Sequence, residues 1–240
     1  MKIINQKPFL VFLDGADGVG KTTTCVELAK LIAADNFNVG ITCVMRFTEI
    51  GALIREQAIN GDNYNEYMNF LGYCYSTFHG VNTIYSKKEH SIIVVDRSQA
   101  STFAQNICSS SLDEQIKTSM LSIFNALNKE FIEKYKGHYV NYLLELDPAQ
   151  ALNRIKKQRD HFDNFEKQGI EFQQKIRNNF RLYFNQNNIN VLSIDTTNIT
   201  QEQVAKEIYK DLKEKLKCHI LHSMDQSSKS NPLLINKKNN

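Results

Sequence analysis

The 240-residue sequence contains neither a long apolar run nor a segment that resembles a signal peptide. Its first apolar run, Phe9 to Leu13, leads directly into a glycine-rich loop. This run is far shorter than the ~20 residues that span a bilayer. A membrane-spanning protein is therefore excluded, and we expect no membrane partner. We expect the protein to stay where it is made, in the cytoplasm, or in the host cytoplasm if its source is a virus.

Paired cysteines and an excess of one charge are also missing. The five cysteines are an odd number and show neither CxxC pairing nor zinc-ligand spacing, which is typical of reduced thiols. The 29 Lys and Arg residues against 26 Asp and Glu residues leave a net charge of only +3. This charge is too small to indicate a nucleic-acid partner.

The composition is that of an ordinary globular protein, with 42% hydrophobic and 23% charged residues. Five apolar runs of strand length are separated by longer stretches with helical periodicity or polar loops. This alternation predicts the α/β class, with a parallel sheet of five strands covered by helices on both faces. The predicted strands are Phe9 to Leu13, Val39 to Met45, Ser91 to Val95, Val140 to Leu146 and Val191 to Ile194.

A single domain is predicted over residues 1–218. Its last element is an amphipathic helix from about Gln201 to Lys217, in which apolar residues recur every four positions. Residues 219–240 are rich in Ser, Asn and Lys. We expect this segment to be a mobile tail.

A phosphate-binding loop follows the first predicted strand. Residues 15–22 read GADGVGKT, which fits the P-loop pattern GxxxxGK[ST], and a predicted helix begins at Lys21. Backbone N–H groups of such a loop bind phosphate oxygens, and the lysine bridges the outer phosphates. The residues predicted to bind ATP are Gly15, Ala16, Asp17, Gly18, Val19, Gly20, Lys21, Thr22 and Thr23.

A magnesium ion is expected beside this loop. The Thr22 hydroxyl and the Asp96 carboxylate, which ends the third predicted strand, are its predicted ligands, Asp96 through water. Arg97 follows, where a motor ATPase would place a glutamate that activates water. Since the guanine-reading motif NKxD is also missing, a motor or a switch GTPase is disfavoured. The histidines form no ligand cluster, so no other metal is indicated.

Three ordered motifs resemble those of thymidylate kinases. They are DGADGVGKTT at residues 14–23, RFTEIG at residues 46–51 and DRS at residues 96–98. The second motif has the form of the eukaryotic and large-DNA-virus branch. The DNFE segment at residues 163–166, with Phe172 and Gln173, resembles the family's lid and the helix after it. The resemblance covers about residues 8–216.

The resemblance implies an enzyme that makes dTDP from dTMP and ATP with Mg²⁺, with a P-loop NTPase fold, a mobile lid near residues 154–166 and a homodimeric assembly. Asp17 would reach the deoxyribose 3′-hydroxyl and the transferred phosphate, and Lys21 and Arg97 would be catalytic. The implied acceptor-binding residues are Arg46 and Arg97 on the monophosphate, Tyr73 or alternatively Phe70 stacked on the base, Ser101 and Gln105 on the base and sugar, and Phe165 beside the ring.

The sequence departs from the family pattern at three positions. Gly18 stands where the branch has a P-loop arginine, Thr77 stands where an arginine bonds the base, and Ser98 replaces a tyrosine. Because Gly18 carries no charge, we expect a residue of the lid to supply the positive charge beside the transferred phosphoryl group. Arg159 is the main predicted donor, with Arg154 or Lys157 next.

Other functions stay open. A deoxynucleoside kinase is favoured by Ser98 but disfavoured by the Arg46 motif, because an acceptor hydroxyl needs no phosphate clamp. Another pyrimidine nucleoside-monophosphate kinase is a further alternative. A catalytically inactive nucleotide-binding module is disfavoured by Asp17, Arg97 and the basic lid.

Overall fold

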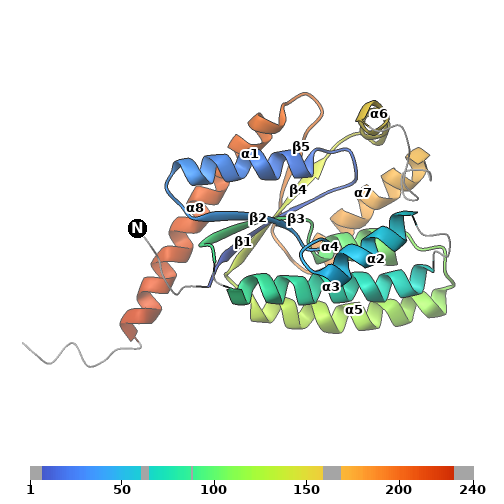
Figure 1. Cartoon of the computed structure of the whole chain (residues 1–240), viewed down its shortest axis with the longest axis horizontal. Helices are drawn as coiled ribbons and strands as arrows, with labels where there is room; N and C mark the ends of the chain where they lie inside the picture. Colours follow the sequence, from blue (N-terminus) through green and yellow to red (C-terminus); the bar gives the residue numbers. More distant parts are fainter. Residues whose placement is uncertain (1–6, 61–64, 88, 159–168, 230–240) are drawn as a thin grey trace, which may run out of the picture.

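One parallel sheet forms the centre of the molecule (Figure 1). The computed structural model describes residues 7–60, 65–87, 89–158 and 169–229. The strands lie in the order β2-β3-β1-β4-β5, and every pair is parallel. They are β1 (Phe9–Asp14), β2 (Val39–Cys43), β3 (Ile92–Asp96), β4 (Tyr139–Glu145) and β5 (Leu192–Asp195). The predicted five-stranded parallel sheet is confirmed.

Helices cover both faces of this sheet. In Figure 1, α1 and α8 lie on one side of the sheet, and α3 and α5 lie on the other. The helical elements are α1 (Lys21–Ala34), α2 (Glu49–Asn60), α3 (Glu66–Lys87), α4 (Gln99–Ser101), the π-helix η1 (Thr102–Ile107), α5 (Glu114–Lys134), α6 (Pro148–Gln158), α7 (Gly169–Gln186) and α8 (Gln201–Lys229). Within the described part of the chain, none of these helices has the length and apolarity to cross a bilayer.

The central strand β1 explains why the strands read as continuous apolar runs. All six of its residues are buried, because each face of a parallel sheet packs against helices. Leu10 and Phe12 share a buried cluster with Phe131 of α5. Val11 and Leu13 belong to the larger cluster, which also includes residues of α1 and α8.

The last helix is longer than predicted. The predicted end of α8 at Lys217 is wrong, because the helix continues to Lys229. No glycine or proline occurs between these residues, and the first proline afterwards is Pro232. The apolar repeat predicts which part of a helix is buried, whereas helix length depends on where a breaking residue occurs.

The topology brings two loops together at the carboxyl ends of neighbouring strands. Strands β1 and β3 are neighbours, and Leu13 is in register with Asp96. The backbone N–H of Arg97, directly after β3, donates to the Leu13 carbonyl at 2.9 Å. The carboxyl ends of strands border the ligand crevice in open α/β sheets. The loop after β1 and the turn after β3 are therefore the elements that build the site.

Candidate active site

The loop between β1 and α1 has the backbone of a phosphate cradle. Gly15, Gly18 and Gly20 have φ angles of 141°, 78° and 95°, which favour glycine because a Cβ clashes there. Helix α1 begins at Lys21, directly after the loop. Amide groups of the loop and the positive end of the helix dipole therefore lie together, as anion binding requires.

Lys21 is held inside this loop. Its side chain is buried, and Nζ donates to the Ala16 carbonyl at 2.7 Å and lies 3.6 Å from Asp17 Oδ1. Burial, together with the charge of Arg97, lowers the pKa of the Lys21 ammonium. The ammonium is therefore positioned to exchange a carbonyl oxygen for phosphate oxygens.

Thr22 and Asp96 meet at the start of α1. The Thr22 hydroxyl donates to Asp96 Oδ2 at 2.6 Å, while Asp96 Oδ1 is buried and makes no hydrogen bond. A hydroxyl oxygen and a carboxylate oxygen are the hard ligands that Mg²⁺ prefers. The two predicted metal ligands thus lie together, and their donor set fits this ion.

An ion pair joins the phosphate loop to the turn after β3. The Arg97 guanidinium donates to Asp17 Oδ1 and, at 3.3 Å, to Gln105 Oε1. Burial alone would raise the pKa of Asp17, but the charges of Arg97 and Lys21 outweigh it and hold that pKa well below its ordinary value. Burial would lower the pKa of Arg97, but Asp17 and Asp96 raise it instead. Both groups therefore stay charged.

Two predicted acceptor residues lie on other elements. Arg46 is exposed in the turn between β2 and α2, where its backbone N–H donates to the Cys43 carbonyl at 2.9 Å. Ser101 is buried, and its hydroxyl donates to Asp14 Oδ1 at 3.1 Å. In this structure, the Ser101 hydroxyl is thus engaged within the protein.

The two candidate stacking rings, both on α3, have different surroundings. Phe70 is completely buried in the larger apolar cluster. Tyr73 is 7% exposed, shares a cluster with Met45 and lies close enough to Arg97 to contribute to its raised pKa. These surroundings favour Tyr73 over Phe70 as the ring that would stack on the base.

Two further predicted site residues, Arg159 and Phe165, lie outside the described residues.

Helix α6 packs closely against Gly18. A Cβ on Gly18 would lie 2.5 Å from the Ala151 carbonyl oxygen, so α6 approaches the loop through a glycine. From the same helix, Arg154 donates to the Thr196 carbonyl at 2.9 Å, and Lys157 is exposed. In this structure, α6 therefore leaves no room for a side chain at position 18.

Thr77 and Ser98, the other two departures from the family pattern, also make hydrogen bonds within the protein. The Thr77 hydroxyl is buried and lies 3.2 Å from the Thr102 hydroxyl. The Ser98 hydroxyl donates to Asp14 Oδ2 at 2.7 Å and accepts from the Ala100 N–H at 3.0 Å. Ser98 is thus a helix cap and a carboxylate partner.

Sequence reasoning missed Arg55 on α2. Its charge helps to lower the pKa of Asp17, so Arg55 belongs to the electrostatic surroundings of the site. Helical spacing could have indicated this, because Arg55 lies four residues after Gly51 and therefore on the same face. Gly51 closely approaches Met45 and Ser76 of the protein body.

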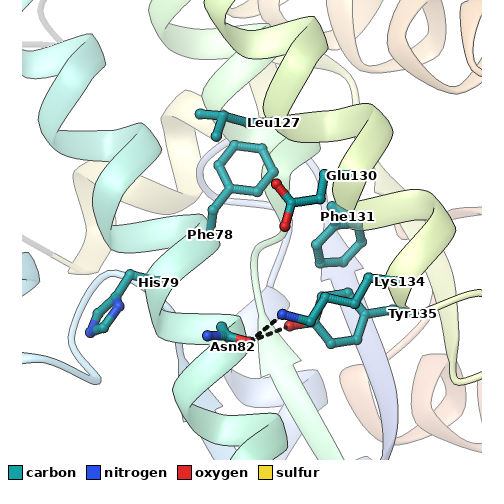
Figure 2. Close-up of a pocket in the computed structure, with 8 residues that line it drawn as sticks. All are labelled: Phe78, His79, Asn82, Leu127, Glu130, Phe131, Lys134 and Tyr135. Carbon is teal, nitrogen blue, oxygen red and sulfur yellow. Dashed lines mark hydrogen bonds between the residues drawn. The ribbon is translucent and has the colours of Figure 1, made fainter.

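A separate pocket lies between α3 and α5 (Figure 2). Within it, Asn82 Oδ1 accepts hydrogen bonds from Lys134 Nζ at 2.7 Å and from the Tyr135 hydroxyl at 3.1 Å. None of the predicted site residues lines this pocket, whose lining consists of Phe78, His79, Asn82, Leu127, Glu130, Phe131, Lys134 and Tyr135.

These features define a P-loop nucleotide-binding protein. They are a strand, a glycine loop and a helix in succession, a buried lysine in the loop, and a carboxylate at the end of the neighbouring strand. The sequence model described as "Thymidylate kinase" matches residues 13–208. The chain belongs to the thymidylate kinase family, and it is therefore a phosphotransferase.

Curated relatives agree in length. The chain is 27% identical over 215 residues to the probable thymidylate kinase of Methanosphaera stadtmanae, with 85% of this chain and 98% of that protein covered. It is 27% identical over 216 residues to the thymidylate kinase of Campylobacter hominis, with 87% and 100% covered.

Solved structures agree in fold. The thymidylate kinase of Ehrlichia chaffeensis matches with a TM-score of 0.62 and 19% identity, covering 86% of this chain and 100% of that chain. The thymidylate kinase of Candida albicans matches with a TM-score of 0.65 and 20% identity, covering 89% and 94%.

Proposed function

We propose that the protein transfers the γ-phosphoryl group of ATP to the phosphate of dTMP, giving ADP and dTDP. The observation that carries this proposal is the ion pair between Asp17 and Arg97. It joins the loop that would hold the donor phosphates to the turn that would hold the acceptor phosphate. Phosphoryl transfer requires mainly such alignment and charge neutralisation.

The residues divide into a donor side and an acceptor side. On the donor side, the amides of the loop and Lys21 would bind the ATP phosphates. On the acceptor side, Arg97 and Arg46 would bind the dTMP phosphate, with Arg55 nearby, because guanidinium groups match phosphate oxygens. Asp17 would orient Arg97 and reach the deoxyribose. Mg²⁺, held by Thr22 and through water by Asp96, would neutralise charge on the donor phosphates.

Lid residues would supply the positive charge that Gly18 does not carry. Arg154 is bonded to the Thr196 carbonyl, which favours Arg159 as the main donor and Lys157 as the next. Arg159→Ala should lower kcat roughly 10³-fold while changing ATP affinity little. Lys175→Ala, which removes an exposed charge on α7, is the matched control and should keep kcat. If Arg159, Arg154 and Lys157 variants all stay within about threefold of wild type, the lid assignment is wrong.

A homodimer is part of the proposal. Exposed apolar side chains occur on α2 and α3, where Leu53 is 61% and Met68 is 64% exposed, and such surfaces commonly mark protein interfaces. Sedimentation should give twice the chain mass for wild type and the chain mass for the variant Leu53→Asp with Met68→Asp. A wild-type monomer at micromolar concentration would contradict it.

A cytoplasmic location is proposed as well. The described cysteines Cys25, Cys43, Cys74 and Cys108 are free thiols, which fits a reducing compartment. Fractionation of the source cell, or of the infected host cell, should recover the enzyme with cytoplasmic markers.

The deoxynucleoside kinase alternative is tested by the acceptor. Ser98 was its main support, and the Ser98 hydroxyl is bonded to Asp14 and Ala100, so this residue has a structural role that needs no nucleoside. ADP release should require dTMP and should be negligible with thymidine. Release with thymidine but not with dTMP would establish the alternative, and release with neither would indicate a non-catalytic module. Comparison with dUMP, dCMP and UMP tests the other pyrimidine monophosphates.

A further inference from the structure

Arg97 has an unusual backbone conformation. Its φ is 75°, and among the described residues the other non-glycine positions with positive φ are Asn36 and Asn188. Asparagine enters this left-handed region more readily than other side chains, whereas arginine rarely does. Such a conformation persists only where the surroundings impose it.

The hydrogen bonds of the next residue, Ser98, indicate which group holds Arg97 in this conformation. The Ser98 N–H donates to Asp14 Oδ1 at 2.9 Å, and the Ser98 hydroxyl donates to Asp14 Oδ2 at 2.7 Å. Both carboxylate oxygens therefore hold one residue, directly after Arg97. The same Ser98 hydroxyl accepts from the Ala100 N–H and caps α4.

Asp14 also holds the segment beyond α4. The Ser101 hydroxyl donates to Asp14 Oδ1 at 3.1 Å, and Asn141 Nδ2 of β4 lies 3.5 Å from Asp14 Oδ2. Helix η1 begins directly after Ser101 and carries Gln105, whose side chain accepts from Arg97. Short π-helical segments are frequent at functional sites.

The carboxylate is completely buried at the end of β1, one residue before the phosphate loop. Burial raises the pKa of Asp14, and the hydrogen bonds from Ser98 and Ser101 oppose that rise. Four hydrogen-bond donors surround the two oxygens of the Asp14 carboxylate. An asparagine side chain has the same shape but cannot accept from all four, since it offers one acceptor oxygen and two N–H donors.

We propose that Asp14 is a positioning residue that, through Ser98, holds Arg97 in the left-handed conformation from which its guanidinium reaches Asp17. This inference rests on the proposed function, because the activity that it serves is transfer to dTMP. Asp14, the last residue of β1, thereby provides a second link to the turn after β3, besides the ion pair between Asp17 and Arg97.

A double-mutant cycle tests this role. Asp14→Asn should lower kcat/KM for dTMP roughly 10- to 100-fold while changing the ATP dissociation constant by less than about threefold. In an Arg97→Ala background, the same change should cost less than about threefold, because the group that Asp14 positions is already gone. Equal losses in both backgrounds would show that Asp14 merely supports the fold.

Two hydroxyl deletions provide the control and a second route. Ser98→Ala removes the bond to Asp14 Oδ2 and should behave like Asp14→Asn in the same cycle. Ser109→Ala removes a hydroxyl that donates to the Ala104 carbonyl at 2.7 Å and should keep kcat/KM. If Asp14→Asn does not fold, the Ser98 cycle decides, and equal losses in both backgrounds overturn the proposal.

A readout without catalysis separates this proposal from the proposed function. In a crystal structure of Asp14→Asn, or of Ser98→Ala if the first does not fold, Arg97 should have a negative φ and be separated from Asp17. An unchanged φ and an unchanged ion pair would overturn the positioning role. If wild type does not phosphorylate dTMP, the proposed function fails, but this structural comparison still decides the role of Asp14.

Discussion

The two ends of the sheet differ in chemistry although the same strands build both. Four strands end on a carboxylate, namely Asp14, Asp96, Glu145 and Asp195, whereas all five begin on an apolar residue. At the carboxyl end these carboxylates accept hydrogen bonds from charged or hydroxyl groups. For example, Arg181 donates from Nε to Glu145 Oε1 at 2.6 Å and from Nη2 to Glu145 Oε2 at 2.8 Å. At the amino end, rings pack on rings.

The ring cluster shows what the amino end contributes. Phe131 lies 4.8 Å from Tyr135 and 5.5 Å from Tyr139, the first residue of β4, measured between ring centroids. Such packing supplies stability without demanding a special backbone. The strained Arg97 and the buried ion pair occur at the opposite end. The comparison indicates that the rings around Phe131 and the charged groups of the site lie at opposite ends of the strands.

The largest expected effect lies at the carboxyl end. Lys21→Ala should abolish detectable phosphoryl transfer, because it removes the charge that accompanies the migrating group, and should leave the fold intact. ADP release and circular dichroism measure the two outcomes. Substantial kinase activity in the folded variant would contradict the assignment of the phosphate loop.

A substitution at the amino end should have the opposite profile. Phe131→Ala should lower the free energy of unfolding by about 3–5 kcal/mol, because it leaves a cavity in a buried ring cluster. The kcat of the folded fraction should stay within about threefold of wild type. Urea unfolding and the dTMP assay check this. Normal stability with a large loss of kcat would break the comparison.

Gly18→Ala should affect both properties, since α6 approaches the loop there. The new Cβ would meet the Ala151 carbonyl oxygen at a φ of 78°, so we expect a loss of about 1–3 kcal/mol in stability and weaker ATP binding. Thermal melting and ATP titration measure these effects. The control is Gly137→Ala, which has a similar φ of 76° but open space around its Cβ, and which should bind ATP normally.

A smaller effect concerns pH. Because the folded-state pKa of Asp17 lies below its ordinary value of 3.8, the unfolded chain binds more protons at this group as the pH falls. The stability that Asp17 contributes is therefore complete above that ordinary value and is lost as the pH falls toward the folded-state pKa. The difference in unfolding free energy between wild type and Asp17→Asn should shrink from about pH 5 to about pH 3. For Phe131→Ala, the difference should not change with pH.

Much of the fold could be predicted from the sequence because its signals are local. The strand runs, the glycine loop and the start of α1 at Lys21 each depend on neighbours along the chain. Thr22 and Asp96 could be paired because parallel topology brings strand ends to one edge. In the structure the Thr22 hydroxyl donates to Asp96 Oδ2 at 2.6 Å, so the two predicted magnesium ligands lie together.

The remaining features depend on contacts that sequence spacing does not encode. Ala151 approaches Gly18, the charge of Arg55 acts on Asp17, and Asp14 accepts hydrogen bonds from Ser98. Each of these interactions joins residues that are distant in the chain. Ser101 illustrates the limit, because its position suited a substrate contact while its hydroxyl is bonded to Asp14. The apolar repeat of α8 ends at Leu216, but such a repeat indicates burial rather than helicity, so it does not mark the end of the helix at Lys229.

The most direct test follows the phosphoryl group itself. ATP labelled in its γ-phosphate should be incubated with dTMP, Mg²⁺ and the enzyme, and the products separated. The label should appear in dTDP in a one-to-one ratio with ADP, and Lys21→Ala should give neither product. Label found only in inorganic phosphate, or no transfer to dTMP by the folded wild-type protein, would contradict the account.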